Sequence, residues 1–309
     1  MPSAVNVGLL VPSNFVGRTP DRREFVDFFR AAEVLGFHSL WAVERVIHER
    51  AAAFHPFSFL AWAAGATSRI KLGTAVVLAT LRHPLLIAKA AGTLDYLSGG
   101  RFVLGVSVGG RPEEFEALGI PIRQRARRLE ETMALLRQMW SGPQVSFQGR
   151  YFSFQGPSLA PRPARPDAIP ILVGGTAEPV LKRAATLGDG WIAGSGAMPE
   201  YVKEGWLKVQ HWATEAGRDP GKLDLGKLLY VAVDDTVAKA RRRLAPYVQG
   251  YYGEQYDVDG RCAFGPPEAC AQKLLPFVAA GVKTFILGLS WPSVRELERL
   301  QRDVVPLLR

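Results

Sequence analysis

The segment Ile70–Leu78 reads IKLGTAVVL, a β-branched apolar run that is typical of a buried strand. A short polar loop follows, and then a helical stretch that Pro84 opens and Gly99-Gly100 closes. The segment Arg101–Val108 reads RFVLGVSV and is predicted as the next strand, which runs directly into Gly109-Gly110-Arg111. A strand, a helix and a strand with glycines at its exit predict a parallel βαβ unit whose ligand lies at the carboxyl ends of the strands.

The same alternation of strands and helices continues along the chain. Further strands are predicted at residues 5–11, 37–43, 171–173, 191–193, 226–233 and 284–287, with helices between them. Eight strand–helix units in 309 residues favour a (β/α)8 TIM barrel, an α/β fold, over an open doubly wound sheet. We therefore expect one domain that spans residues 1–309.

Two segments interrupt this rhythm. Residues 145–154 alternate polar and apolar side chains around Gln148-Gly149, which predicts an inserted β-hairpin. Residues 247–265 contain four tyrosines and are predicted to be rich in loops, so they are a candidate lid.

Composition narrows the class of partner. The chain has 38 Lys and Arg against 29 Asp and Glu, a net charge of +9, which could suit nucleic acid, a membrane surface or small anions. The basic residues are dispersed, and the densest run, Arg123–Arg128, has no aromatic residues among its arginines. We therefore expect a solvated helix face there, with part of an anion site as the alternative, and no nucleic-acid partner.

Two further classes of site are disfavoured. Cys262 and Cys270 lack the spacing of metal ligands, so no metal site is expected. No apolar run approaches the roughly eighteen residues of a membrane span, and no leader pattern follows Met1. The simplest expectation is a cytoplasmic protein without a membrane partner.

The predicted strand at 171–173 ends in Gly174-Gly175-Thr176, a candidate anion site. The glycines let a ligand approach the backbone, and Thr176 can cap the next helix, whose free N–H groups suit a phosphate. An ordinary turn with a Thr cap explains the same residues. Gly109-Gly110-Arg111 is a weaker version, and two glycine-rich exits on neighbouring strands favour a shared phosphorylated ligand.

Three side chains are candidates for the chemistry. Glu44 and Arg45 follow the strand at 37–43, where this fold places active residues, although a surface ion pair is the alternative. His83 either opens the helix at Pro84 or points into the barrel mouth. No nucleophilic triad, carboxylate pair or metal cluster is evident, so the chemistry would belong to a bound cofactor.

Several segments, taken together and in order, resemble the bacterial luciferase-like superfamily, and most closely its branch that uses the 8-hydroxy-5-deazaflavin coenzyme F420. The resemblance covers essentially the whole chain. Its segments are Gly36–Trp41 (GFHSLW), Leu72–Val76 with Arg82-His83-Pro84, Leu94–Arg101 (LDYLSGGR), Glu114–Gly119 (EFEALG), Gly149–Phe152 (GRYF) and Ile171–Gly175 (ILVGG).

The resemblance implies a TIM barrel with the coenzyme ring in its mouth. It implies a bulge with a cis peptide bond between Ala75 and Val76 that backs the ring. It also carries the phosphate contacts to Gly174, Gly175 and Thr176, and the ring and ribityl contacts to Gly109 and Glu113.

The chain departs from the family pattern at two places. Many relatives have Asp-His where this chain has Glu44-Arg45, so an imidazole is replaced by a guanidinium that cannot release a proton at neutral pH. Some relatives that oxidise sugar phosphates carry a carboxylic acid at the position of Gly110, and its absence disfavours that substrate.

The resulting expectation is an F420-dependent oxidoreductase that moves a hydride between the coenzyme and a small organic substrate. Glu44 is the first candidate to polarise or protonate the reacting group, His83 is the second, and Arg45 is an anion anchor. The alternatives are a monooxygenase that uses reduced FMN from a separate flavin reductase, and a non-catalytic flavin- or deazaflavin-binding protein. A homodimer is expected from the resemblance.

Overall fold

The computed structural model describes residues 5–12, 14–15, 19–48, 52–164 and 169–308. Eight parallel strands close into a barrel in which β10 pairs with both β7 and β11, and the first strand pairs with the last. They are β1 (Asn6–Leu10), β3 (Ser39–Ala42), β5 (Lys71–Thr74), β7 (Phe102–Ser107), β10 (Ile171–Gly174), β11 (Gly190–Ala193), β12 (Asp224–Val233) and β14 (Thr284–Gly288). The predicted TIM barrel and all eight of its strands are confirmed.

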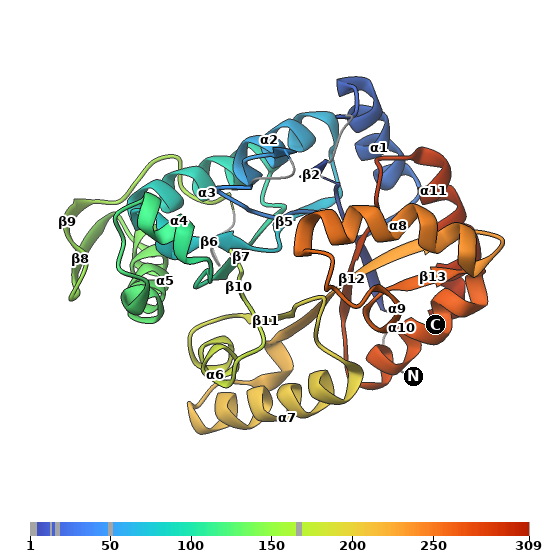
Figure 1. The fold of residues 1–309 in the computed structure, drawn as a ribbon. Coiled ribbons are helices and arrows are strands. Elements are labelled where there is room, and N and C mark those ends of the chain that lie inside the picture. Colours follow the sequence, from blue (N-terminus) through green and yellow to red (C-terminus); the bar gives the residue numbers. More distant parts are fainter. Residues whose placement is uncertain (1–4, 13, 16–18, 49–51, 165–168, 309) are drawn as a thin grey trace.

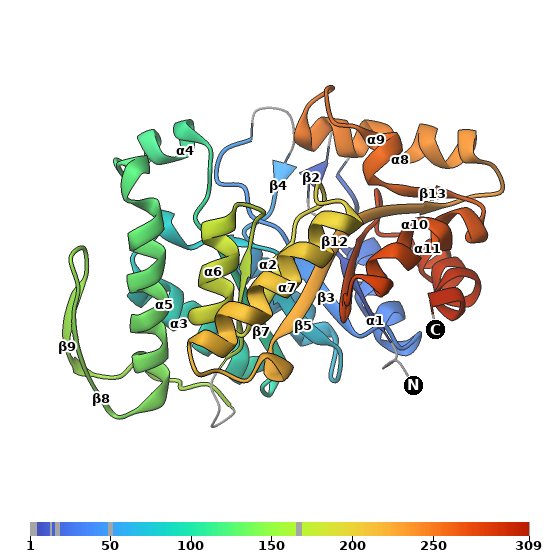
Figure 2. The same cartoon turned by 90° about the horizontal axis from the view of Figure 1, so that it is seen from below.

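Helices surround the barrel (Figure 1). They are α1 (Arg22–Val34), α2 (Pro56–Ala66), α3 (Pro84–Ser98), α4 (Pro112–Ala117), α5 (Arg125–Ser141), α6 (Glu178–Thr186), α7 (Pro199–Glu215), α8 (Val237–Tyr252), α9 (Val258–Arg261), α10 (Pro267–Ala279) and α11 (Val294–Arg299). Figure 2 shows α4, α8 and α9 together at one end of the barrel. This end holds the carboxyl ends of the strands, because α4 follows β7 and α8 follows β12. We call it the mouth.

Alternation along each strand separates two buried layers, as the two-residue period of a strand requires. On β12, Leu229 packs outward among the helices, whereas its neighbour Tyr230 lies in a second cluster inside the barrel. Leu287 and Ile286 divide in the same way on β14. The barrel interior is therefore a packed core, and a ligand must bind above it.

The predicted hairpin is confirmed by the antiparallel pair β8 (Gln144–Gln148) and β9 (Ser153–Pro157). The buried carboxylate of Glu131 on α5 holds its turn, because it accepts hydrogen bonds from the backbone N–H groups of residues 150–152. The short antiparallel pair β2 (Asn14–Phe15) and β4 (Ala52–Ala53) was not predicted.

The prediction of a loop-rich segment at 247–265 is wrong. Helix α8 extends to Tyr252, and after a short turn α9 leads into β13 (Ala263–Gly265), which pairs with β12. The tyrosines face the apolar interior of the mouth, and this tertiary burial stabilises a helix that local sequence does not announce. Among the described residues, no helix combines the length and apolar character needed to cross a bilayer.

Candidate active site at the barrel mouth

A bulge interrupts the third barrel strand where the resemblance placed it. Gly73 on β5 pairs with Val103 on β7. Val77, on the strand β6 (Val77–Leu78), lies four residues after Gly73 but pairs with Val106, which lies only three residues after Val103. The bond between Ala75 and Val76 is cis, so this prediction is confirmed. Both the bulge and the cis bond therefore lie at the carboxyl end of this strand.

The hydroxyl of Thr74 repairs the ladder beside the bulge. It donates to the carbonyl oxygen of Gly105 at 2.8 Å and accepts from the N–H of Gly105 at 2.9 Å. Thr74 is fully buried, so both backbone groups of Gly105 would otherwise lack a partner away from water.

The bulge touches the predicted phosphate loop. A Cβ atom added to Gly174 would lie 2.6 Å from Cγ1 of Val76, so glycine is needed for the two segments to meet. Val76 is only partly buried, which leaves an apolar surface at the mouth. The structure therefore brings the two predicted cofactor segments into contact.

The turn between β10 and α6 has its own fixed geometry. Gly175 has a φ of 137°, and its N–H donates to the carbonyl oxygen of Ile192 at 3.3 Å. Its own carbonyl accepts from Nε1 of Trp191 at 2.7 Å, and the hydroxyl of Tyr201 donates to the carbonyl of Thr176. Trp191 and Tyr201 are contacts that sequence reasoning missed.

The prediction that Thr176 caps the next helix is wrong. The N-cap residue is Ala177, and no side chain caps this end. In the described part of the chain, no hydrogen bond uses the backbone N–H groups of residues 176–178. These donors at the positive end of α6 can bind an anion.

Gly109 and Glu113 lie beyond the end of β7. Gly109 has a φ of 69°, and its carbonyl accepts from Nη1 of Arg125 at 3.3 Å. Glu113 is exposed and pairs with Arg111 at 3.4 Å. Arg125, in the basic run 123–128, therefore reaches the mouth, as the alternative prediction of part of an anion site requires. Arg127 in the same run is exposed and pairs with acidic residues of α5.

Glu44 is a buried carboxylate with both oxygens engaged. Oε2 accepts from the N–H of Leu78 at 2.7 Å and from Nη1 of Arg82 at 2.6 Å, and Oε1 accepts from Nη2 of Arg82. The surface ion pair with Arg45 is not formed. The sequence analysis named Arg82 beside His83 but did not predict its pairing with Glu44. Glu44 lies 38 residues earlier in the chain, and no periodic pattern relates it to Arg82.

His83 takes the helix-opening position. Its Nδ1 accepts from the N–H of Leu85 at 3.3 Å, so it is the N-cap of α3. Its ring packs edge-on against Phe152 with centroids 5.3 Å apart, and burial, followed by the charge of Arg128, lowers its pKa. The structure thus places His83 against the turn of the hairpin, and no hydrogen bond among the described residues joins it to Glu44 or Arg45.

Arg45 crosses the mouth to α8. Its Nη2 donates to the carbonyl oxygen of Tyr251 at 3.1 Å, and its guanidinium lies 4.8 Å from the centre of the Tyr251 ring. The loop that carries Arg45 is held by the buried carboxylate of Glu114, which accepts from the N–H groups of Val46 and Ile47. Arg45 therefore links the two sides of the mouth.

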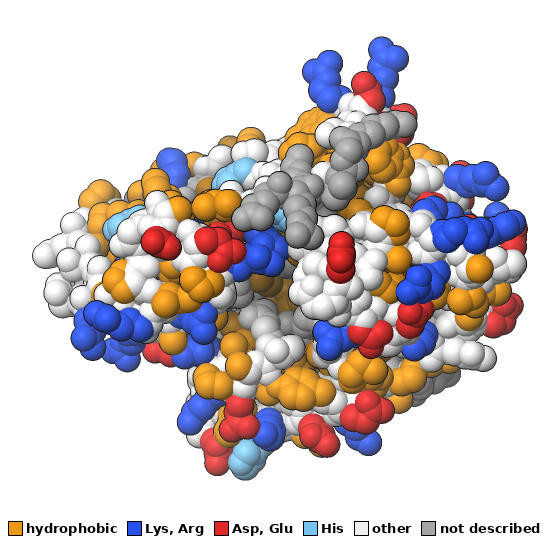
Figure 3. Space-filling model, in the orientation of Figure 1, with side chains coloured by type: hydrophobic (Ala, Val, Ile, Leu, Met, Phe, Trp, Pro, Cys, Tyr) orange, Lys and Arg blue, Asp and Glu red, His pale blue; other side chains and the backbone are white. Residues whose placement is uncertain are grey.

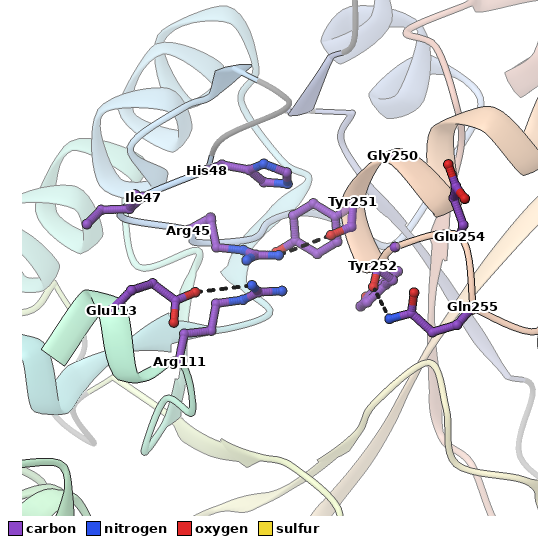
Figure 4. A pocket seen from close by; sticks show the side chains of 11 residues that line it. Arg45, Ile47, His48, Arg111, Glu113, Gly250, Tyr251, Tyr252, Glu254 and Gln255 are labelled. Carbon is purple, nitrogen blue, oxygen red and sulfur yellow. Dashed lines mark hydrogen bonds and ion pairs between the residues drawn. The ribbon is translucent and has the colours of Figure 1, made fainter. Parts of the chain in front are cut away.

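A pocket of about 410 Å³ opens beside this contact (Figure 4). Its lining comes from the β3 and β7 exits and the end of α8: Arg45, Ile47, His48, Arg111, Glu113, Gly250, Tyr251, Tyr252, Gly253, Glu254 and Gln255. The space-filling view of the mouth shows a hollow at its centre (Figure 3). Sequence reasoning singled out Arg45 and Glu113, and it named Arg111 within the glycine-rich exit of residues 109–111 but gave its side chain no role.

Tyrosines form the inner wall on the α8 side. The hydroxyls of Tyr230 and Tyr252 are 3.2 Å apart, and Tyr252 stacks on Tyr256 with centroids 4.7 Å apart. Burial raises the pKa of Tyr252 to about 12, and burial also raises the pKa of Tyr230 well above its ordinary value. These phenols keep their protons at neutral pH and can donate hydrogen bonds.

Comparison with known proteins agrees with this geometry. The F420-dependent glucose-6-phosphate dehydrogenase of Kineococcus radiotolerans is 34% identical over 70% of this chain and 66% of its own length. That of Rhodococcus jostii is 30% identical over 93% of this chain and 94% of its own length.

Solved structures share the fold at lower identity. A monooxygenase from Streptomyces bottropensis superposes with a TM-score of 0.87 at 23% identity, covering 97% of this chain and 99% of its own. An F420-dependent secondary alcohol dehydrogenase in complex with an F420-acetone adduct gives a TM-score of 0.86 at 22% identity, with 99% of each chain covered. The profile of the family described as luciferase-like monooxygenase matches residues 5–261. The chain belongs to this luciferase-like monooxygenase family of oxidoreductases.

Proposed function

We propose that the protein is an F420-dependent oxidoreductase that transfers a hydride between the deazaflavin and a small organic substrate. The observation that carries this proposal is the contact between the Ala75–Val76 bulge and Gly174, directly before the turn into α6. The two curated relatives described above are both named for F420, and the one from Rhodococcus jostii matches over 93% of this chain; both support the choice of coenzyme.

The residues present fit such a coenzyme. The partly exposed Val76 offers an apolar surface for one face of a planar ring. The N–H groups at residues 176–178 offer donors for a phosphate at the start of α6. When bound, the coenzyme supplies a carbon that accepts or donates the hydride, and the chain's own residues bind it, orient it and limit access of water.

Glu44 and Arg82 act as positioning residues in this proposal. Their ion pair and the bond from Glu44 to the Leu78 N–H fix β6 directly after the bulge. The earlier hypothesis that Glu44 exchanges a proton with substrate requires it to leave this ion pair. Arg45, rather than Glu44, lines the pocket of about 410 Å³ at the mouth.

For the substrate we propose a small organic molecule other than a sugar phosphate. Gly110 has no side chain, and Nη1 of Arg125 lies 3.9 Å from the place of a Cβ atom there. Some sugar-phosphate-oxidising relatives carry a carboxylic acid at this position. This chain has no side chain there, and the nearest charged group is the positive guanidinium of Arg125. Glucose 6-phosphate belongs in the substrate panel as the direct test of this point.

The test is a pair of fluorescence titrations of the purified protein with coenzyme F420 and with FMN. Trp191, which bonds to Gly175, is a built-in reporter of the turn, and Trp191→Phe identifies its part of the quenching. We expect F420 to bind more tightly, and the reduced coenzyme to be oxidised only when an acceptor is added.

Three outcomes would contradict the proposal in different ways. Tighter FMN binding with oxygen-dependent turnover would assign the protein to the reduced-FMN monooxygenases. Coenzyme binding without hydride transfer to imines, aldehydes, alcohols and enones would indicate a binding protein. Binding of neither coenzyme would remove the cofactor assignment.

We also propose a homodimer. Helix α3 exposes Leu86 to 66%, Tyr96 to 61% and Leu97 to 62%, an unusual density of apolar surface for one helix. Light scattering on the purified protein should give twice the chain mass, and Leu86→Lys with Leu97→Lys should give a monomer.

A further inference from the structure

Two guanidinium groups from different loops converge on one pocket. Arg45 follows β3 and Arg111 follows β7, and both line the pocket of about 410 Å³ beside Tyr251. In Figure 4 both side chains extend from the same wall toward α8, with their charged ends close to the Tyr251 ring. Both charges also act on Tyr251, whose pKa burial raises and the two arginines lower. Two positive charges on one wall of a pocket repel each other, and an anion bound between them relieves this repulsion.

Most of the hydrogen-bonding capacity of this pair is unused within the described chain. Arg45 gives Nη2 to the Tyr251 carbonyl at 3.1 Å and lies against the ring of the same residue. Among the described residues Arg111 forms its ion pair with Glu113, at 3.4 Å, and both side chains are about half exposed, so this bond is weak. Each guanidinium carries about five N–H donors in a planar fork that matches a carboxylate or phosphate.

The rest of the pocket suits an organic molecule. Tyr251, Tyr252 and Ile47 supply aromatic and aliphatic surface, and Gln255 supplies a neutral polar group. The other acid of the lining, Glu254, is on the opposite wall, and Figure 4 shows its carboxylate turned away from the arginines. Glu113 offsets one of the two guanidinium charges at the end of the pocket that holds Arg45 and Arg111, so this end carries one net positive charge.

We propose that Arg45 and Arg111 together bind the acid group of an organic substrate, so that the substrate is an organic acid. This rests on the proposed function in one respect, namely that the pocket serves the same reaction as the coenzyme surface at Val76. The same chemistry could instead recognise the anionic tail of the coenzyme. The site is distinct from the predicted phosphate turn at residues 174–176, which lies at the end of β10 (Ile171–Gly174).

The experiment measures binding by calorimetry with four probes. Benzoate and benzamide differ only in the acid group, and coenzyme F420 is compared with the riboside, meaning here the deazaflavin that keeps its ribityl chain but lacks the phosphate and the tail. The proteins are the natural chain, Arg45→Gln, Arg111→Gln and the matched control Arg242→Gln. Arg242 is an exposed arginine of α8 that does not line the pocket. Melting temperatures confirm that each variant is folded.

We expect benzoate to bind at least tenfold more tightly than benzamide. Arg45→Gln and Arg111→Gln should each weaken benzoate binding about tenfold or more, because each loses a charge-assisted pair. Their affinity for the coenzyme should stay that of the natural chain. The control variant Arg242→Gln should bind benzoate and the coenzyme as the natural chain does. If the variants instead weaken F420 but not the riboside, the pocket binds the coenzyme's anionic tail, and the proposed organic-acid substrate is wrong.

The inference is also overturned if benzoate binding does not distinguish the two variants from Arg242→Gln. Its failure is separate from that of the proposed function. Arginine-dependent benzoate binding in a protein that binds no F420 would leave the anion site standing and remove the coenzyme.

Discussion

The two sides of the barrel mouth are built from different interactions. On the side of β5, β6 and β7, buried polar side chains bond directly to backbone: Thr74 to Gly105, and Glu44 to Leu78. On the side of β12 and α8, aromatic rings pack on one another, and the hydroxyl of Tyr230 meets that of Tyr252.

The two kinds of interaction give the two sides of the mouth different tolerance to change. Bonds from side chain to backbone hold the bulge in one conformation, because each broken bond would leave a buried group without a partner. Packed rings tolerate changes of size and polarity more easily. We therefore infer that the first side sets the fixed shape of the mouth and that the second side tolerates changes in the size and polarity of the pocket.

The largest effect is expected at Glu44. Its side chain is 2% exposed and that of Arg82 is 20% exposed, so Glu44→Gln leaves a largely buried guanidinium without its counter-charge. We expect a loss of about 3–5 kcal/mol in the free energy of unfolding, measured by urea denaturation.

Activity measurements on the same variant separate the two roles of Glu44. If Glu44 is a positioning residue, Glu44→Gln and Arg82→Met should lower turnover by similar factors. A fully stable Glu44→Gln protein with turnover reduced about 10²–10⁴-fold, beside a normal Arg82→Met protein, would make Glu44 the proton carrier.

Lys227 on β12 should make stability depend on pH. It is fully buried, donates to the carbonyl of Gly194 at 2.7 Å, and burial lowers its pKa to about 7. The unfolded chain keeps this proton up to about pH 10.4, so between these values it binds a proton that the folded protein lacks. The free energy of unfolding should therefore rise with pH in this window, by at most about 1.4 kcal/mol per unit.

Urea denaturation at pH 7.5, 8.5 and 9.5 measures this slope. Lys227→Met removes the titrating group, so its contribution to the slope should disappear. An equal slope in both proteins would assign the pH dependence to other groups.

Gly174→Ala should disturb the bulge. The added Cβ would lie 2.6 Å from Cγ1 of Val76, and such overpacking costs about 1–3 kcal/mol. We expect lower stability and weaker coenzyme binding. Val76→Ala in the same chain removes the clashing atoms and should restore stability.

The matched control is Gly194→Ala on the neighbouring strand exit, where nothing lies within 4 Å of the added atom. If Gly174→Ala and Gly194→Ala behave alike, the contact between the bulge and β10 does not shape the site.

The smallest effect is expected on the aromatic side. Tyr252→Phe removes the hydroxyl that meets those of Tyr230 and Ser195, and should cost about 1 kcal/mol of stability. Tyr96→Phe, at a position exposed to 61%, should cost nothing measurable. A loss at Tyr252 as large as that at Glu44 would end the contrast between the two sides.

The sequence by itself determined the barrel, because the patterns that predict each strand and helix lie within short segments of the chain. Each strand is a short apolar run between turn residues, and the alternation of strands and helices has few compact solutions. The hairpin at 145–154 and the position of the bulge at Ala75–Val76 were also predicted, the first from alternation and the second from the resemblance. Glu44, Arg45, Gly109 and the loop at residue 174 all lie at the mouth because the ends of parallel strands meet there.

Only the tertiary structure decided what these residues contact. Glu44 pairs with Arg82, His83 caps α3, and Arg111 joins Arg45, although nothing in their spacing relates these partners. The helix α8 forms through Tyr252 because its tyrosines are buried against the barrel interior, a stabilisation that local propensity does not contain. Local pattern fixes the path of the backbone, whereas the partner of a charge or a ring depends on which loops folding brings together.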